Sequence, residues 1–343
     1  MNLKLCLQIY LFFSICLLLH SCTNKKEIDV SKISVNVKIE RFDKDFSALT
    51  PQNISAQAPQ LHKKYGFFFK DFMENMIGAG SAADTSYYKS LRIILLNKDY
   101  QELKSAVELK YPDMNVTQKE LINAFKHIRH YYPTQKFPRI ISFFSGFSVQ
   151  TPIGNDYIGI GLDMFLGADS KFYPALRQSI PAYISKRFSP DNITPRLIEG
   201  FAREELFPEK DADRSLLSKM VYNGKILYFL DAVMPQTADS LKIGYTSLQM
   251  DWSTNFQSEI WAYFLQNDLL YESDYMKIQK YLTDSPFTPG IGTNSESAPK
   301  LGIYTGWQIV KLYMKKNPQI TLQQLMKETD AQKILNGSKY KPR

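Results

Sequence analysis

The distribution of cysteine is the feature that most constrains this chain. All three cysteines, Cys6, Cys16 and Cys22, lie in the N-terminal segment of a 343-residue chain. The remainder contains no thiol that could form a disulfide within one chain, act as a nucleophile or bind a metal as thiolate. Its fold must be stabilised by apolar burial, and aromatic side chains are abundant, with 22 Phe and 21 Tyr in the whole chain.

The N-terminal segment has the pattern of an export signal. Lys4 provides one positive charge, residues 5–19 are uncharged and mostly apolar, and small Ser21 directly precedes Cys22. The apolar stretch is too short to span a bilayer. The segment resembles a bacterial lipoprotein signal, which implies cleavage after Ser21 and attachment of diacylglycerol, and usually a third acyl chain such as palmitate, to Cys22. An ordinary secretory signal with an incidental cysteine is the alternative.

The acylated chain is expected to stay on a membrane. One acyl chain binds only marginally, at about 0.8 kcal/mol per buried methylene, whereas two or three chains on Cys22 bind stably. Thr23 stands where an aspartate commonly retains lipoproteins at the inner membrane, which favours the outer membrane and its periplasmic face. An exported protein meets no nucleic acid, so the formal charge of +8 indicates solubility or weak attraction to anionic surfaces.

Polarity divides the chain into three parts. Residues 1–21 form the signal, and the polar segment 22–34 is expected to be the lipidated N-terminus and a short tether. The rest, 35–343, is predicted to be a single helix-rich domain, since no internal repeat or low-complexity tract interrupts it.

Three segments have the pattern of strands. Residues 35–42 alternate apolar and polar side chains, as in a half-buried strand. Residues 138–144 and 156–162 are Ile-rich and separated by a connection that contains Gly and Pro, which predicts a hairpin in a small sheet.

Most of the remaining sequence has helical periodicity, so the predicted fold class is α+β, predominantly α-helical with a small sheet or hairpin. Thr117 with Glu120, and Thr246 with Gln249, have the spacing of capping boxes at helix N-termini. Thr194 is expected to cap the helix that Pro195 then begins. Helices are predicted in several segments over 58–132 and over 173–188, 194–207, 213–233, 246–267, 273–282, 302–315 and 321–335.

Motifs for common chemistry are missing from the sequence. The three histidines beyond the signal are His62, His127 and His130, and none forms the His-Glu-x-x-His pattern of zinc peptidases. His127 and His130 are predicted on a solvated helix face, away from the apolar stripe. No nucleophile elbow, phosphate-binding loop or dinucleotide fingerprint is present.

Glu199 has two possible roles. Its Glu-Gly-x-Ala context resembles the helix that supplies the carboxylate ligand in many zinc peptidases. Alternatively, Glu199 lies four residues before Arg203, the favourable orientation for a helix ion pair worth a few tenths of a kcal/mol. Gly200 costs about 1 kcal/mol in a helix interior relative to Ala, which indicates close packing there.

Two features near the C-terminus are candidate contact surfaces. Gly302 and Gly306 lie one turn apart and leave a stripe without side chains, where another backbone can approach. The long loop 283–299 has no secondary-structure pattern, and a loop of this length is usually functional or disordered.

Several stretches together resemble one family, that of the gliding motility lipoprotein GldB. Beyond the lipobox they are Ile39-Glu40-Arg41-Phe42-Asp43, Tyr228-Phe229-Leu230-Asp231-Ala232, Glu259-Ile260-Trp261-Ala262-Tyr263-Phe264, Pro286-Phe287-Thr288, Glu296-Ser297 and Gly306-Trp307-Gln308-Ile309-Val310. The resemblance implies a component of the gliding machinery and its linked secretion system, which works by binding other proteins and has no cofactor. It also implies a distant, degenerate relation to zincin-type peptidases. Zinc hydrolysis is not carried over, because the segment 173–188 contains no histidine.

Two alternatives remain open at this stage. The first is a hydrolase that uses carboxylates from different helices, such as Glu199, Glu259 and Glu296, with or without a metal. The second is a lipoprotein that binds a small molecule of unknown identity, which would require a deep pocket lined by aromatic side chains.

Overall fold

The computed structural model describes residues 28–210, 213–292 and 296–343. Ile33–Arg343 is one compact unit. Of the other unit, Met1–Lys32, residues 28–32 are described, and there Asp29 accepts a hydrogen bond from the Ser31 amide at 2.9 Å. The predicted signal, Cys22 and the first part of the predicted tether lie outside the described residues. Within the described ranges, no helix combines the length and apolarity needed to cross a bilayer.

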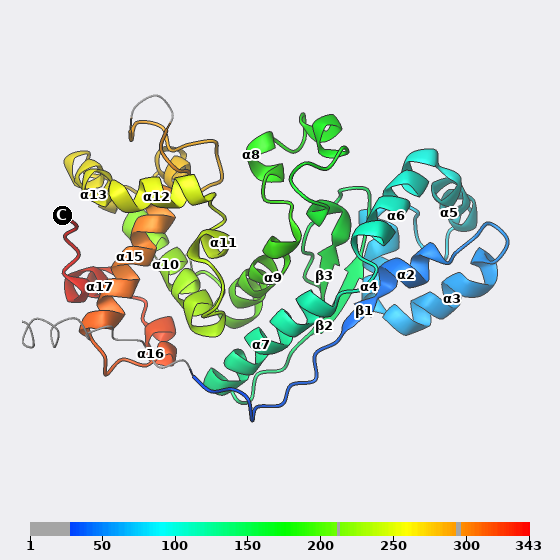
Figure 1. Cartoon of the computed structure of the whole chain (residues 1–343), viewed down its shortest axis with the longest axis horizontal. Helices are drawn as coiled ribbons and strands as arrows, with labels where there is room; N and C mark the ends of the chain where they lie inside the picture. The colour runs from blue at the N-terminus through cyan, green and yellow to red at the C-terminus, as the bar shows by residue number, and fades with distance from the viewer. Residues whose placement is uncertain (1–27, 211–212, 293–295) are drawn as a thin grey trace, which may run out of the picture. The chain divides into compact units, whose positions relative to one another are not determined.

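The strands of the compact unit form one small sheet in the order β1-β2-β3. They are β1 (Ile39–Arg41), β2 (Arg139–Phe143) and β3 (Tyr157–Gly161). Their positions confirm the three predicted segments, although β1 covers only part of 35–42. Both pairings are parallel, so the predicted hairpin is wrong (Figure 1).

The connection between β2 and β3 explains the parallel direction. Residues 149–154 run back along the free edge of β3, where the Gly161 amide donates to the Gln150 carbonyl at 2.9 Å. A Cβ atom at Gly161 would lie 2.5 Å from the carbonyl oxygen of Val149, so glycine is required for this approach. The chain is thereby returned to the start of the sheet and enters β3 in the direction of β2.

Apolar side chains cover both faces of the sheet, as is usual for parallel strands. On one face, Ile141 and Phe143 belong to a cluster that includes many aromatic residues of the N-terminal helices. In this cluster the buried Phe42 ring lies edge-on to Phe68, with the ring centroids 4.9 Å apart. The other face, which includes Ile140, belongs to a larger core that extends to the C-terminal helices.

The predicted helical content of 58–132 is confirmed. Thr117 is not a cap, because α7 begins earlier, after Met114, and Thr117 is buried in its first turn. Glu120 instead accepts a hydrogen bond from the Thr194 hydroxyl at 2.6 Å. The helices are α2 (Phe42–Ser47), α3 (Ile54–Tyr65), α4 (Phe67–Asp71) with a π-helical turn after it, α5 (Tyr87–Leu96), α6 (Lys98–Lys110) and α7 (Asn115–Tyr131).

The C-terminal half is almost wholly helical. Its elements are α8 (Ala182–Ser185), α9 (Ile193–Phe201) followed by a π-helical turn (Ala202–Leu206), α10 (Leu216–Val233), α11 (Asp239–Ile243), α12 (Ser247–Asn255), α13 (Gln257–Gln266), α14 (Tyr275–Ile278), α15 (Leu301–Lys316), α16 (Leu322–Lys327) and α17 (Ala331–Ser338). The coarse α+β assignment is therefore confirmed, with helix predominant.

The helix predicted over 173–188 does not form. Only a 3-10 turn (Tyr173–Leu176) and the four-residue α8 occur there. Pro181 lacks an amide for a helical hydrogen bond and disfavours helical geometry at the residue before it, which separates the two pieces. Thr194 also does not cap α9, which begins one residue earlier, after Asn192.

Two long predicted helices are each divided in two. Residues 246–267 form α12 and α13, which separate at Phe256, a residue that is 41% exposed. Residues 321–335 form α16 and α17, separated by an extended Glu328.

The capping box of Thr246 with Gln249 is confirmed at the start of α12. The segment 273–282 contains only the short α14 and a 3-10 turn.

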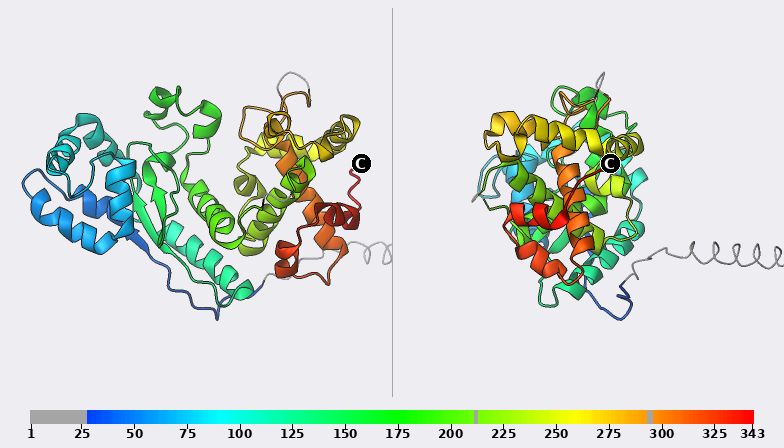
Figure 2. Two further views of the ribbon diagram at one scale, coloured as in Figure 1. Left: turned by 180° about the vertical axis from the view of Figure 1, so that it is seen from behind. Right: turned by 90° about the vertical axis from the view of Figure 1, so that its left-hand side faces the viewer.

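Helices α10 and α15 cross in close contact (Figure 1 and Figure 2). A Cβ atom at Gly306 would lie 1.8 Å from the Met220 carbonyl oxygen, and one at Gly224 would lie 2.3 Å from the Gly306 carbonyl oxygen. The predicted approach of another backbone is confirmed. The prediction of an open contact groove beside Gly302 and Gly306 is wrong, because α10 and the segment at Tyr281 fill that space.

Candidate functional site

Glu199 lies on α9 between two arginines. Its carboxylate is 2.5 Å from the Arg196 guanidinium and accepts hydrogen bonds from Arg203 at 2.9 and 3.0 Å. The side chain is 16% exposed. The predicted pair with Arg203 is therefore confirmed, and Arg196, one turn earlier on the same face, is a second partner that the sequence analysis did not identify.

Electrostatics fix the charge of Glu199. Burial alone would raise the pKa of its carboxyl, but the two neighbouring guanidinium groups outweigh burial and lower that pKa to about 2. The guanidinium groups also reach other elements: Arg196 donates to the Leu241 carbonyl at 3.0 Å, and Arg203 donates to the Asn223 side chain at 2.9 Å. The carboxylate thus stays ionised at neutral pH and joins α9 to α10 and α11, rather than transferring protons.

A second charge cluster, which joins buried Lys300 to exposed Asp284, holds the loop 283–299. Asp284 pairs with Arg187 at 2.7 Å and with Lys300 at 2.9 Å. Burial raises the pKa of Asp284, whereas these two cations lower it to about 2. Lys300 donates to the Ile243 carbonyl at 2.8 Å, and burial lowers its pKa to about 8. The loop is therefore bound to the helices by charge near both of its ends.

The other predicted carboxylates do not join Glu199. Glu259 lies in the first turn of α13 and Glu296 follows the part of the loop that is not described, and both are exposed. Neither has a hydrogen bond or an ion pair within the described chain. No group of three or more His, Cys, Asp or Glu side chains is placed to hold a metal among residues 28–210, 213–292 and 296–343.

The histidines correct one prediction. His130 is exposed, as predicted, but His127 is 2% exposed and lies in the core. Its Nδ1 is 2.9 Å from the Asn123 carbonyl oxygen, one turn earlier. The solvated-face prediction failed because the buried arc of α7 is wider than its apolar stripe and includes small Ala124 beside His127.

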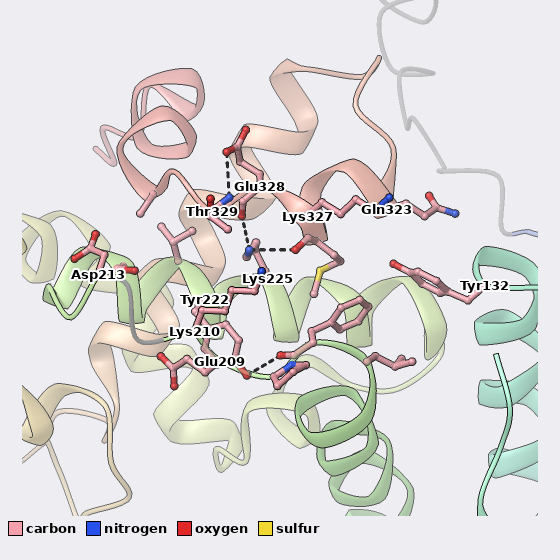
Figure 3. Close-up of a pocket in the computed structure, with 17 residues that line it drawn as sticks. Tyr132, Glu209, Lys210, Asp213, Tyr222, Lys225, Gln323, Lys327, Glu328 and Thr329 are labelled. Carbon is pink, nitrogen blue, oxygen red and sulfur yellow. Dashed lines mark hydrogen bonds between the residues drawn. The ribbon is translucent and has the colours of Figure 1, made fainter. Parts of the chain in front are cut away.

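A cavity of about 670 Å³ opens between α10, α16 and the segment 206–210 (Figure 3). Tyr222 and Lys225, nearly one turn apart on α10, form one wall, and Met326 contributes to the opposite wall. The Tyr222 hydroxyl donates to the Phe207 carbonyl at 3.1 Å. A cavity of this size is in the usual range for small-ligand sites.

Lys225 is not among the site residues predicted from the sequence, although its helix carries a signal. α10 is apolar on most of its surface and buried over most of its length, from Leu216 to Val233. A lysine in such a helix is unusual, because a buried charge needs a partner or a function.

Comparison with known proteins identified one family. The family model described as gliding motility protein GldB matches residues 23–342. The search of curated proteins found no match, and the search of solved structures found none.

Proposed function

The chain belongs to the family of gliding motility protein GldB, and from this we propose that it is a lipid-anchored, non-catalytic component of the gliding machinery and its linked secretion system. It is held by acyl chains on Cys22 at the periplasmic face of the outer membrane, where it binds other machinery proteins. The observation that carries the proposal is the family match over nearly the whole chain, from residue 23, which directly follows the predicted lipidated cysteine.

The anchor gives this role a physical basis. Acyl chains on Cys22 confine the domain to a thin layer beside one membrane, where partners held on the same membrane have a high effective concentration. Weak individual contacts then suffice to keep an assembly together.

The carboxylate geometry favours binding over hydrolysis. A hydrolase that used Glu199 with Glu259 and Glu296 would need them close together and one of them able to exchange a proton. Instead, Glu199 is neutralised by two guanidinium groups, whereas the other two carboxylates are exposed. In the proposed zincin ancestry, Glu199 is a remnant of a ligand position, and arginine supplies the positive charge that a metal once provided.

Affinity capture from membranes tests the proposal. Tagged wild-type protein should retain gliding or secretion proteins, and Cys22→Ala should lose the membrane and most of these partners. Cys16→Ala is the matched control, because Cys16 lies in the segment that is removed. Equal partners for Cys22→Ala and the wild type would contradict anchored assembly.

Metal analysis separates the hydrolase alternative. The proposal predicts no stoichiometric zinc in the purified full-length protein. Zinc at one equivalent that is lost on Glu199→Ala, together with turnover of a peptide substrate, would favour the enzyme instead.

A further inference from the structure

Lys225 is a buried cation that has no acidic partner among the described residues. The residue is 8% exposed, and its Nζ donates to the carbonyl oxygens of Glu328 at 2.7 Å and of Met326 at 3.4 Å. In the described part of the chain it forms no ion pair. Burial lowers the pKa of this ammonium group, and nearby Glu328 offsets that effect only in part. Buried charges are normally paired, so the missing anion calls for an explanation.

The carboxylates that line the cavity do not supply that anion. Each of them is already bound elsewhere: Glu209 pairs with Lys219 at 2.9 Å, Glu328 pairs with Lys333 at 2.5 Å, and Asp213 accepts the Ser215 amide at 2.8 Å. Lys210 and Lys327 also line the cavity, and neither has an ion pair among the described residues. Among the described lining residues, Lys210, Lys225 and Lys327 thus have no ion pair, against one such carboxylate, Asp213, so this part of the lining has an excess of unpaired positive charge.

The remaining wall is suited to an apolar body with one polar contact. Phe207 and Met326 contribute apolar surface to the cavity. Tyr132 packs its ring against Phe207, with centroids 5.7 Å apart. Its hydroxyl is buried without a partner in the described chain, and Figure 3 shows it directed toward the cavity. A buried hydroxyl without a hydrogen bond is destabilising, and an acceptor on a ligand would supply the missing bond.

We propose that this cavity binds a monocarboxylate with an apolar or aromatic body: Lys225 holds the carboxylate, and Tyr132 donates a hydrogen bond to a second acceptor on the body where the ligand has one. Lys210 and Lys327 are exposed, so Lys225 is the one buried ammonium group in the described lining, and a single buried positive charge favours a carboxylate over a doubly charged phosphate. Free small acids and the C-terminus of a polypeptide share this chemistry. The inference adds a ligand to the proposed function and does not depend on it.

Calorimetric titration of the purified full-length protein tests the site. The probes are 3-phenylpropionate with its uncharged amide, and the tetrapeptide Ala-Ala-Ala-Phe with a free or an amidated C-terminus. At least one acid should bind, and its amide should bind at least about tenfold more weakly, since the charge-assisted hydrogen bond is lost. Tighter binding of the small acid or of the peptide identifies the source of the ligand.

Variants assign the binding to the named residues. Lys225→Met should weaken binding of either acid by about tenfold or more, and Tyr132→Phe should weaken binding of the free-acid tetrapeptide, whose backbone carbonyls are further acceptors, by about threefold. Lys63→Met, an exposed lysine on α3, is the matched control and should bind as the wild type does. If circular dichroism shows that Lys225→Met does not fold, the inference is tested instead by the affinity of Tyr132→Phe and by the ratio of the affinities for acid and amide in the wild type.

Three results would overturn the inference. The first is that neither acid gives a heat of binding at probe concentrations up to about 5 mM. The second is that each acid and its amide bind with equal affinity, and the third is that Lys225→Met and Tyr132→Phe both bind the acids as tightly as the wild type.

Discussion

Replacing Glu199 by glutamine removes the negative charge between Arg196 and Arg203 but keeps the size of the side chain. Both guanidinium groups, whose side chains are 18% and 25% exposed, would stay mostly shielded from water and lose their ionic partner. The pKa of the carboxyl falls from an ordinary 4.5 to about 2 on folding, which at about 1.36 kcal/mol per pH unit corresponds to roughly 3 kcal/mol of stability. This agrees with the 3–5 kcal/mol that is typical for removing one partner of a buried pair.

The sign of the pH dependence follows from the lowered pKa. A carboxyl whose pKa is lower in the folded state stabilises the fold above its unfolded pKa, and this contribution is lost as the pH falls from about 5 to 2. Urea denaturation followed by circular dichroism should give a difference of about 3 kcal/mol between wild type and Glu199→Gln at pH 7, and the difference should shrink below pH 5.

Glu259→Gln is the matched control, because it makes the same chemical change at an exposed position and should alter stability by less than about 0.5 kcal/mol. A Glu199→Gln variant within about 1 kcal/mol of wild type at pH 7, or a difference that does not change with pH, would refute the reasoning.

The remaining predictions concern helix crossing and capping. Gly306→Ala should destabilise the fold by about 3 kcal/mol, because the new Cβ meets the rigid Met220 backbone. Gly200→Ala should be neutral or slightly stabilising in the same urea assay, since its new Cβ meets only the end of the Ile153 side chain at 3.3 Å. Equal changes in stability for the two glycine variants would contradict the crossing geometry. Thr246→Ala should cost about 1 kcal/mol through loss of the capping box, whereas exposed Ser247→Ala should stay within about 0.5 kcal/mol. Equal melting curves for these two variants would contradict the cap.

Local patterns predicted where the elements lie but not how they pair. The Ile-rich segments located β2 and β3, and the periodicity of 302–315 located α15. The direction of β3 depends on backbone hydrogen bonds to residues 150–154, which no local pattern records. The break between α12 and α13 at Phe256 was also not predicted, because the helical spacing of apolar residues continues across it.

The candidate site was predicted only where its partners are close in sequence. The pair of Glu199 with Arg203 follows from helical spacing, as does the contact with Arg196 once α9 is given. The pairing of Asp284 with Arg187 joins residues almost a hundred positions apart, so one sequence could not reveal it. Lys225 could be recognised in the sequence as a charge in an apolar helix. Only the folded structure shows that nearby carboxylates pair with other lysines.

The most direct test of a lipid-anchored component is the mass of the mature N-terminus, measured on protein extracted from the membrane. A lipid-anchored protein should give an N-terminal peptide that begins at Cys22 and carries the mass of two or three acyl chains. An N-terminus at Met1, or an unmodified Cys22 on protein recovered from the soluble fraction, would contradict the lipid anchor.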